Sequence, residues 1–371
     1  MLLGLLLKQK QLLGSSIYYS ANKWMKALTF SLLSWVFVIY CKRHMFKLYG
    51  ILLLSFTFTS ALAVPFIGFL YRLKFKNNVS DNDANPPVGG DLLIIIATIL
   101  FSLIYYALTS YTINWTSIIL FVSLLGFGAL GFYDDFQKIF HHKKRGFIML
   151  TIWQKLILQI IGGLVIGYLL YTYMGLSTVW LPVLTPVWGV AAIELGALYI
   201  PFAVLVIIIM SNAFKATNGT DGLATGLMLI ALSAYWYLAQ PFLQAYGDIH
   251  LFIAVLMGSL FAFLYFNIFP ARLRMGDTGS QAFGALLAVI ALMINQVMLL
   301  PIIAGVFVAE LISILIQKAS MRLRGKKVFR AIPLHSHFES KGWDPTKVTM
   351  RFWLVGVTLV FVGLLFASVP T

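Results

Sequence analysis

The sequence predicts an all-α integral membrane protein with about ten transmembrane helices and with its active-site loops in the cytoplasm. Of the 371 residues, 60% are hydrophobic and only 11% are charged, and the mean hydropathy is +0.91. This composition leaves too little polar surface to cover a soluble enzyme, and it is too apolar for a disordered chain. The apolar stretches are continuous rather than alternating, which argues against a membrane β-barrel.

The predicted core covers residues 46–371, and it holds ten spans of about 20 residues, the length that a helix needs to cross a bilayer. Pro201 and Pro301 lie near the starts of two spans, where a missing amide hydrogen costs nothing, and Pro241 and Pro270 follow two others. The expected spans are 46–71, 91–110, 115–133, 150–174, 198–214, 223–240, 249–269, 279–296, 297–317 and 350–369. Residues 1–45 form a separate N-terminal segment, whose apolar stretch 27–41 is either an extra span or an interfacial helix.

The basic residues are distributed unevenly among the connections between spans. The net charge is +15, from 27 Lys and Arg against 12 Asp and Glu. Lys and Arg occur in the connections after spans one, three, five, seven and nine, whereas the connections after spans two, four, six and eight contain none. Cytoplasmic loops of membrane proteins collect basic residues, so the first set is predicted to be cytoplasmic. The same rule accounts for the positive charge without a nucleic-acid partner.

Two adjacent carboxylates mark the cytoplasmic end of the third span. Asp134 and Asp135 are followed by Lys138 in the segment Gly131–Lys138. Paired carboxylates repel each other, and a cation can neutralise them; hard oxygen ligands of this kind suit Mg²⁺. Lys138 adds a positive charge for a phosphate. The alternative is a solvated helix end with a local ion pair.

Two further loops combine polar residues with glycine. Ser211–Gly222 contains Asn-Gly and Asp-Gly turns, whose amides can face a ligand. Pro270–Ser280 leads into the eighth span and places Asp277 between glycines at a helix start. We expect a cation bridged to a phosphate there, with the free amides of the helix N-terminus favouring the phosphate itself. The alternative is an ordinary capping turn.

The longest cytoplasmic connection carries His335 and His337, two residues apart. These are candidate metal ligands, phosphate partners or acid–base groups, or else solvated loop histidines. Because no cysteine or third clustered histidine completes it, a zinc site is not expected. Four such loops on one face predict a cytoplasmic site for a phosphorylated ligand and a divalent cation. Of the charged residues, only Glu310 and Lys155 lie within spans and away from their very ends, which argues against a pump or channel.

The four loops together resemble the polyprenyl-phosphate N-acetylhexosamine-1-phosphate transferases, and more narrowly the phospho-N-acetylmuramoyl-pentapeptide transferase family. The resemblance covers about residues 46–371. It is carried by Asp134-Asp135-x-x-Lys138, by Asn267 with Met275–Ser280, by Val306–Glu310, and by Pro333–Glu339 with Lys341-Gly342-Trp343. The last of these is typical of the pentapeptide-transferase branch.

The resemblance implies that undecaprenyl phosphate attacks UDP-N-acetylmuramoyl-pentapeptide in the inner membrane, giving lipid I and UMP. It implies that Asp277 holds Mg²⁺, that Lys138 and His335 contact phosphate, and that Asp134 or Asp135 positions or deprotonates the lipid phosphate. It further implies substrate-binding roles for Asn212, Lys215, Asn218, Gly219, Asp221, Asn267, Ser280, His337 and Glu310. The expected partners are these two substrates and the lipid bilayer; whether the chain forms a homodimer is left open.

The sequence departs from the family pattern at several positions. Lys215 stands where the family has Asn, Asn218 where it has Asp, and Arg274 where it has an aromatic residue. Ser336 interrupts a triple-histidine motif, and Asn82 and Pro87 replace a Lys and a Thr. Several of these positions contact the uridine end of the substrate in the family. Two alternatives follow: a sister transferase for another UDP-N-acetylhexosamine, or a degenerate, non-catalytic member that acts in assembly.

Overall fold

The computed structural model describes residues 46–73, 86–109, 112–140, 150–182, 192–242 and 247–368. The chain divides into two compact units, Met1–Gly50 and Ile51–Thr371. The predicted N-terminal segment 1–45 and the departure at Asn82 lie outside the described residues.

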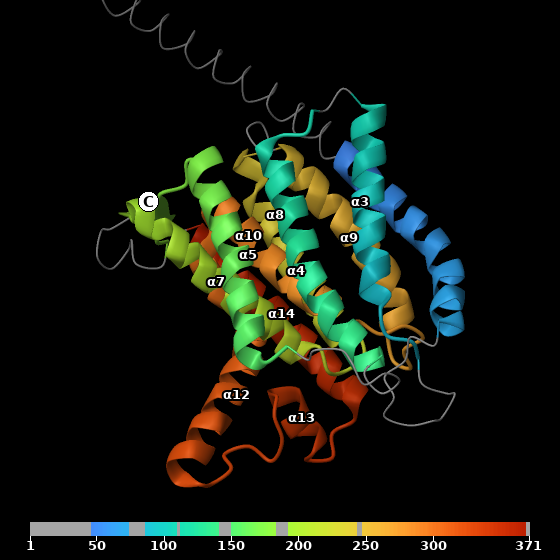
Figure 1. Cartoon of the computed structure of the whole chain (residues 1–371), viewed down its shortest axis with the longest axis vertical. Coiled ribbons are helices and arrows are strands. Elements are labelled where there is room, and N and C mark those ends of the chain that lie inside the picture. Colours follow the sequence, from blue (N-terminus) through green and yellow to red (C-terminus); the bar gives the residue numbers. More distant parts are fainter. Residues whose placement is uncertain are drawn as a thin grey trace, which may run out of the picture. The chain divides into compact units, whose positions relative to one another are not determined.

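The prediction of an all-α membrane protein is confirmed, because each of the ten expected spans contains helix in the described residues (Figure 1). Seven helices are long and apolar enough to cross a membrane: Phe46–Arg72, α3 (Gly90–Leu108), α4 (Trp115–Phe140), α5 (Ile152–Tyr173), α7 (Tyr199–Thr217), α9 (Gly247–Asn267) and α14 (Pro345–Ala367). The remaining elements are α8 (Leu223–Leu238), α10 (Asp277–Met293), α11 (Leu300–Ile303), α12 (Gly305–Arg324), α13 (Leu334–Glu339) and the 3₁₀ turns Gly196–Leu198, Gln240–Phe242 and Val297–Leu299. A count by length and composition therefore gives seven spans, or eight with the bent pair of α11 and α12.

Helix α10 forms the centre of the core. All of its residues are buried, and it packs against α4 and α7. Glycines permit the close approach: a Cβ on Gly131 of α4 would lie 2.2 Å from the carbonyl oxygen of Asp277, and one on Gly284 would lie 2.6 Å from that of Met210. By contrast, α5 and α14 expose large apolar side chains such as Trp153 and Phe361, as lipid-facing helices do.

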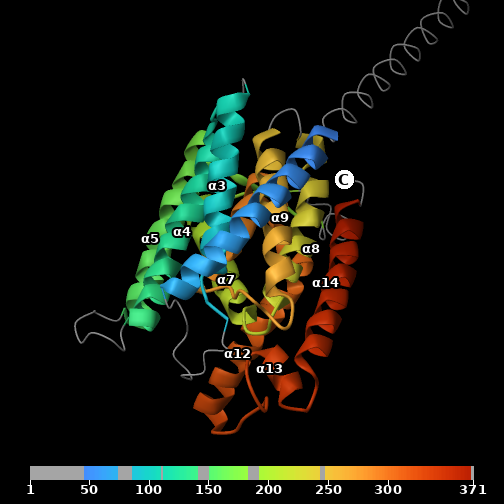
Figure 2. The ribbon, with the colours of Figure 1, turned by 90° about the vertical axis from the view of Figure 1, so that its right-hand side faces the viewer.

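Two expectations about helix limits were wrong. The third predicted span ends at residue 133, whereas α4 continues to Phe140, because its charged residues find partners inside the protein. The ninth predicted span is continuous, whereas the chain bends by 77° between Val297–Ile303 and α12. There Gly305 packs so closely on α14 that a Cβ would lie 2.9 Å from Leu359. Figures 1 and 2 show α12 running on beside α13, past the lower ends of α4, α5 and α7.

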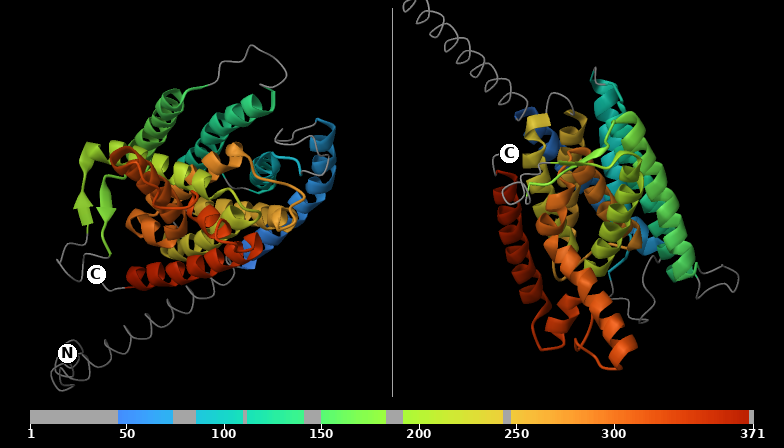
Figure 3. Two further views of the ribbon diagram at one scale, coloured as in Figure 1. Left: turned by 90° about the horizontal axis from the view of Figure 1, so that it is seen from below. Right: turned by 90° about the vertical axis from the view of Figure 1, so that its left-hand side faces the viewer.

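A small antiparallel sheet, which the sequence does not predict, follows α5. Strand β1 (Thr178–Trp180) pairs with β2 (Ala192–Glu194), and Val179 lies opposite Ile193. The amide of Trp180 donates to Asn295 at the far end of α10 (3.2 Å). The sheet therefore lies at the opposite end of the helices from α13, as Figure 3 shows.

Candidate active site

The start of α10 is capped by a carboxylate from another helix. Its own N-cap residue is Gly276, which has no side chain to accept the first amides. Asp135 of α4 takes that place: it accepts from the amides of Asp277 and Thr278 (2.8 Å each) and from the Thr278 hydroxyl (2.7 Å). Asp135 faces α10 because it lies one helical turn after Gly131, where the two helices touch.

A second carboxylate, Asp91 of α3, completes this cap. The backbone of Gly89 and Gly90 donates to the carbonyl of Arg274, which brings the start of α3 to the loop before α10. Asp91 is fully buried, and its Oδ2 accepts from the amides of Gly276 (3.0 Å) and Gly279 (2.5 Å). The expectation of free amides for a phosphate was therefore wrong: the four amides from Gly276 to Gly279 all donate to carboxylates.

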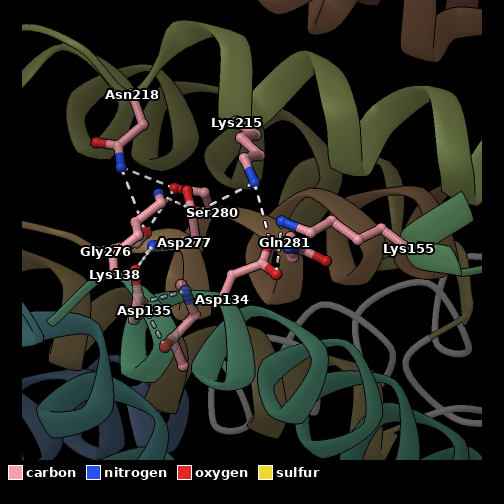
Figure 4. A network of polar contacts seen from close by, with 12 residues as sticks. Asp134, Asp135, Lys138, Lys155, Lys215, Asn218, Gly276, Asp277, Ser280 and Gln281 are labelled. Carbon is pink, nitrogen blue, oxygen red and sulfur yellow. Dashed lines mark hydrogen bonds and ion pairs between the residues drawn. The ribbon is translucent and has the colours of Figure 1, made fainter. Parts of the chain in front are cut away.

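Asp134, the neighbour of Asp135, belongs to an ion-pair network instead (Figure 4). Its side chain is only 2% exposed, and it lies 2.9 Å from the ammonium of Lys155 and 3.3 Å from that of Lys215. The amide of Gln281 also donates to it (3.3 Å). Two adjacent carboxylates therefore have different surroundings, because successive side chains on a helix point about 100° apart.

Asp277 shares one of those lysines. Its Oδ2 contacts the ammonium of Lys138 and lies 3.1 Å from that of Lys215. Lys215 thus joins Asp134 of α4 to Asp277 of α10 (Figure 4). Lys155 and Asp91 are absent from the predicted site residues. Two features of the sequence could have pointed to them: Lys155 is a charged residue within an apolar span, and Asp91 directly follows Gly89-Gly90.

The polar network continues away from the lysines through amide side chains. Gln281 contacts Gln159 of α5 (3.4 Å), and Gln159 accepts from the predicted site residue Asn212 (3.0 Å). Asn212 also donates to the carbonyl of Ile208 within α7 (2.8 Å). Asn212 therefore lies between α5 and α7 and does not line the cavity.

The departure at position 218 has a structural explanation. The amide nitrogen of Asn218 donates to the carbonyls of Met275 (3.1 Å) and Gly276 (3.4 Å) and to the hydroxyl of Ser280 (2.7 Å). A carboxylate has no hydrogen to donate to the two carbonyls, so Asp is unsuited to this position. Asn218 and Ser280 thereby join the end of α7 to the start of α10.

The loop between α9 and α10 is held by two other predicted residues. Asn267 donates to the carbonyl of Leu273 (3.0 Å) and accepts from the amide of Gly222 (3.2 Å). Asp221 lies 3.0 Å from the guanidinium nitrogen of Arg274, so the departure at Arg274 forms an ion pair. Both contacts fix the loop against the start of α8.

The two predicted histidines point in different directions from α13. Glu310 of α12 is fully buried, accepts from the amides of Leu334 (2.6 Å) and His335 (3.1 Å), and lies 3.2 Å from Nδ1 of His335. The other ring nitrogen, Nε2, faces Gly219, where a Cβ would lie 2.3 Å from it. His337 instead accepts from the amide of Arg330 (3.1 Å), and its pKa is lowered by partial desolvation and by the nearby positive charges.

These elements enclose a polar cavity of about 220 Å³. It is lined by Val88, Asp135, Lys138, Asn218, Gly219, Thr220, Asp221, Asn267, Arg274, Met275, Gly276 and Asp277. Among the predicted site residues, Asp134, Lys215, Asn212 and Ser280 lie in the surrounding network, and His335 reaches the cavity through its contact with Gly219. Glu310 acts on His335 from behind, and His337 lies away from the cavity.

The residues around the cavity suit a divalent cation only when a bound phosphate ligand supplies further oxygen atoms. No group of three or more His, Cys, Asp or Glu side chains suited to a metal occurs among the described residues. Of the three described carboxylates that line the cavity, Asp135 caps α10 and Asp221 is paired with Arg274, which leaves Asp277, whose partners are lysine side chains. Mg²⁺ is commonly held by one or two carboxylates together with substrate phosphates, and Asp277 fits that arrangement.

The fold and the cavity define a polytopic membrane protein with a charged site at the ends of its helices. Residues 115–295 match the family described as Glycosyl transferase family 4. The chain is 37% identical over 321 residues to a phospho-N-acetylmuramoyl-pentapeptide-transferase of Halalkalibacterium halodurans (84% of this chain, 95% of that protein). It is 36% identical over 346 residues to that of Leptospira biflexa (84% and 90%), and 38% identical over 302 residues to that of Desulforapulum autotrophicum (76% and 80%). The chain therefore belongs to the phospho-N-acetylmuramoyl-pentapeptide transferase family.

Proposed function

We propose that this chain transfers phospho-N-acetylmuramoyl-pentapeptide from its UDP donor to undecaprenyl phosphate, with Mg²⁺, giving lipid I and UMP. A phosphate oxygen of the acceptor attacks the β-phosphorus of the donor, and the bond to the UMP oxygen breaks with its electron pair on UMP. The observation that carries the proposal is a cavity lined by Lys138 and Asp277, with His335 beside it. The names of the relatives supply the transferred group.

The lysines of the site suit a reaction between two polyanions. Lys138 is 49% exposed at the cavity and can turn from Asp277 to a phosphate oxygen. Lys215 and Lys155 stand behind it and hold Asp134 in place. Positive charge fixed in a low-dielectric site stabilises developing phosphate charge without reorganising water. Bound Mg²⁺ would offset the diphosphate charge and assist departure of UMP.

The carboxylates act in this proposal by positioning rather than by removing a proton. Both oxygens of Asp135 accept from the first turn of α10, and those of Asp134 face Lys155 and Lys215. An alkyl phosphate is already mostly ionised near neutral pH, since its second pKa is about 6. The acceptor therefore needs orientation more than it needs a base.

His335 has a fixed orientation in the same proposal. Glu310 holds its Nδ1 side, so the opposite ring edge is presented to the loop of Gly219 at the cavity. A histidine oriented in this way by a buried carboxylate is suited to bind a phosphate oxygen or to carry a proton.

The proposed location is the inner membrane, with the site facing the cytoplasm. The positive-inside distribution of Lys and Arg supports it, as does the cytoplasmic origin of UDP-sugars. Cysteine placed at Thr220 or Ser336, after Cys41 is replaced, tests the orientation. A membrane-impermeant thiol reagent should label inverted vesicles and spare intact cells, and labelling from outside would contradict this location.

The decisive assay measures UMP release by the purified protein from UDP-N-acetylmuramoyl-pentapeptide, with undecaprenyl phosphate and Mg²⁺. Release should require all three components and should be lost on chelation and in Asp277→Asn. Preference for another UDP-N-acetylhexosamine in competition would favour the sister-transferase alternative. Absence of release with every donor, in protein that is folded, would favour the non-catalytic one.

A further inference from the structure

Lys215 is placed between two carboxylates that belong to different helices. Its ammonium lies 3.3 Å from Asp134 and 3.1 Å from Asp277. Each carboxylate also has a lysine of its own, Lys155 for Asp134 and Lys138 for Asp277. Lys215 is therefore the shared cation of the network, and the other two lysines each contact one carboxylate (Figure 4).

Local structure holds Lys215 in this place. It lies in the last turn of α7, where the helix dipole favours a positive charge. Helix α7 packs along α10, and the contact of Gly284 with Met210 brings the two backbones together just before Lys215. Three residues later, the hydrogen bond from Asn218 to Ser280 ties the end of α7 to α10 again. The side chain is thus anchored on both sides of its own turn.

The charges around Asp277 decide how it meets a metal ion. Among the described residues, the carboxylates of Asp134 and Asp277 contact three ammonium groups, and Asp135 adds a third carboxylate at the start of α10, so the lysines already neutralise the acidic side chains of this part of the site. A divalent cation approaching Asp277 is repelled by the ammonium of Lys215 at close range. The phosphates of a bound donor make the site negative, because they bring additional negative charge and further oxygen ligands.

We propose that Lys215 is a built-in cation that occupies part of the divalent ion's place at Asp277. The protein alone then binds a divalent ion weakly, and the ion enters together with the diphosphate ligand. This inference rests on the proposed function for the identity of that ligand alone. Lys215 acts here as a positioning residue, which sets the order and strength of cation binding.

The test uses Mn²⁺ as a probe, with free Mn²⁺ measured by electron paramagnetic resonance on the purified full chain without donor. Lys215→Met should bind Mn²⁺ about tenfold more tightly than the wild type, since a charge close to the ligand carboxylate is removed. Lys155→Met is the matched control: it removes the same charge from Asp134 but none from Asp277, and its affinity should change less than about threefold. Lys215→Arg keeps the charge and should bind as weakly as the wild type.

Two results would overturn the proposal: no tightening in Lys215→Met, or equal tightening in Lys215→Met and Lys155→Met. Size-exclusion profiles and apparent Tm establish folding, and Lys215→Gln, which retains a polar end, replaces Lys215→Met if the latter misfolds. The binding measurement does not depend on turnover. If the wild-type protein releases no UMP but Lys215→Met shows the expected tighter Mn²⁺ binding, the transferase function is rejected and this inference stands. If the wild-type protein releases UMP but Lys215→Met binds Mn²⁺ no more tightly than the wild type, this inference is rejected and the transferase function stands.

Discussion

Replacing Asp135 by alanine tests whether this carboxylate holds the start of α10. The substitution leaves three buried donors without their acceptor: the amides of Asp277 and Thr278 and the Thr278 hydroxyl. An unsatisfied buried donor costs about 1 kcal/mol or more, so the expected loss of stability is about 3 kcal/mol. Replacing Asp134 by alanine removes ion pairs to two lysines that can extend into water, and it should cost about 1 kcal/mol or less.

Thermal unfolding of the two variants in lipid nanodiscs measures this difference. Asp135→Ala should lower the apparent Tm by roughly 6 °C, and Asp134→Ala by roughly 2 °C or less. Amide hydrogen exchange supplies a local readout, because the amides of Asp277 and Thr278 should exchange faster in Asp135→Ala alone. Equal Tm shifts in the two variants, or unchanged exchange at these amides, would refute the assignment of Asp135 to the cap.

Three other substitutions follow from contacts around the cavity. Glu310→Gln weakens a charge-assisted contact to His335 and should lower kcat for UMP release about tenfold with little change in KM; an unchanged kcat would contradict the positioning role. Gly219→Ala puts a methyl group within 2.3 Å of Nε2 of the buried His335, so the ring or the loop must shift and activity should fall at least about tenfold; unchanged activity would contradict a role for His335 at this position. Asn218→Asp turns a donor into a carboxylate facing the carbonyl of Gly276, so stability should fall by about 2 kcal/mol in thermal unfolding, and an equal or higher Tm would show that the position tolerates the charge.

The helical core is predictable from the sequence because lipid imposes a simple rule. A long apolar segment must satisfy its backbone internally, and the α-helix does this within one segment. Hydropathy therefore locates the helices, but it ends them where charge begins. It misses the last two turns of α4, where Asp134 and Lys138 find partners on other helices. It also misses the 77° bend before α12, which depends on packing against α14.

The site shows the same division. Residue types and loop positions were enough to collect Asp134, Asp135, Lys138 and Asp277, but they could not separate two neighbouring aspartates. That separation depends on which helix each carboxylate meets, and the start of α10 comes from a distant part of the chain. The sequence does not single out Asp91 as a site residue for the same reason, since its partners are backbone amides nearly two hundred residues away in sequence.

The two departures from the family pattern that add a positive charge are both paired with carboxylates, and this bears on the non-catalytic alternative. Lys215 contacts Asp134 and Asp277, and Arg274 contacts Asp221. In a site that no longer binds a ligand, nothing selects for ion pairs between substituted residues. Buried charges there can be replaced by apolar residues with little or no loss of stability. Here each added positive charge meets a carboxylate at or beside the cavity. That arrangement favours a site that still binds charged ligands.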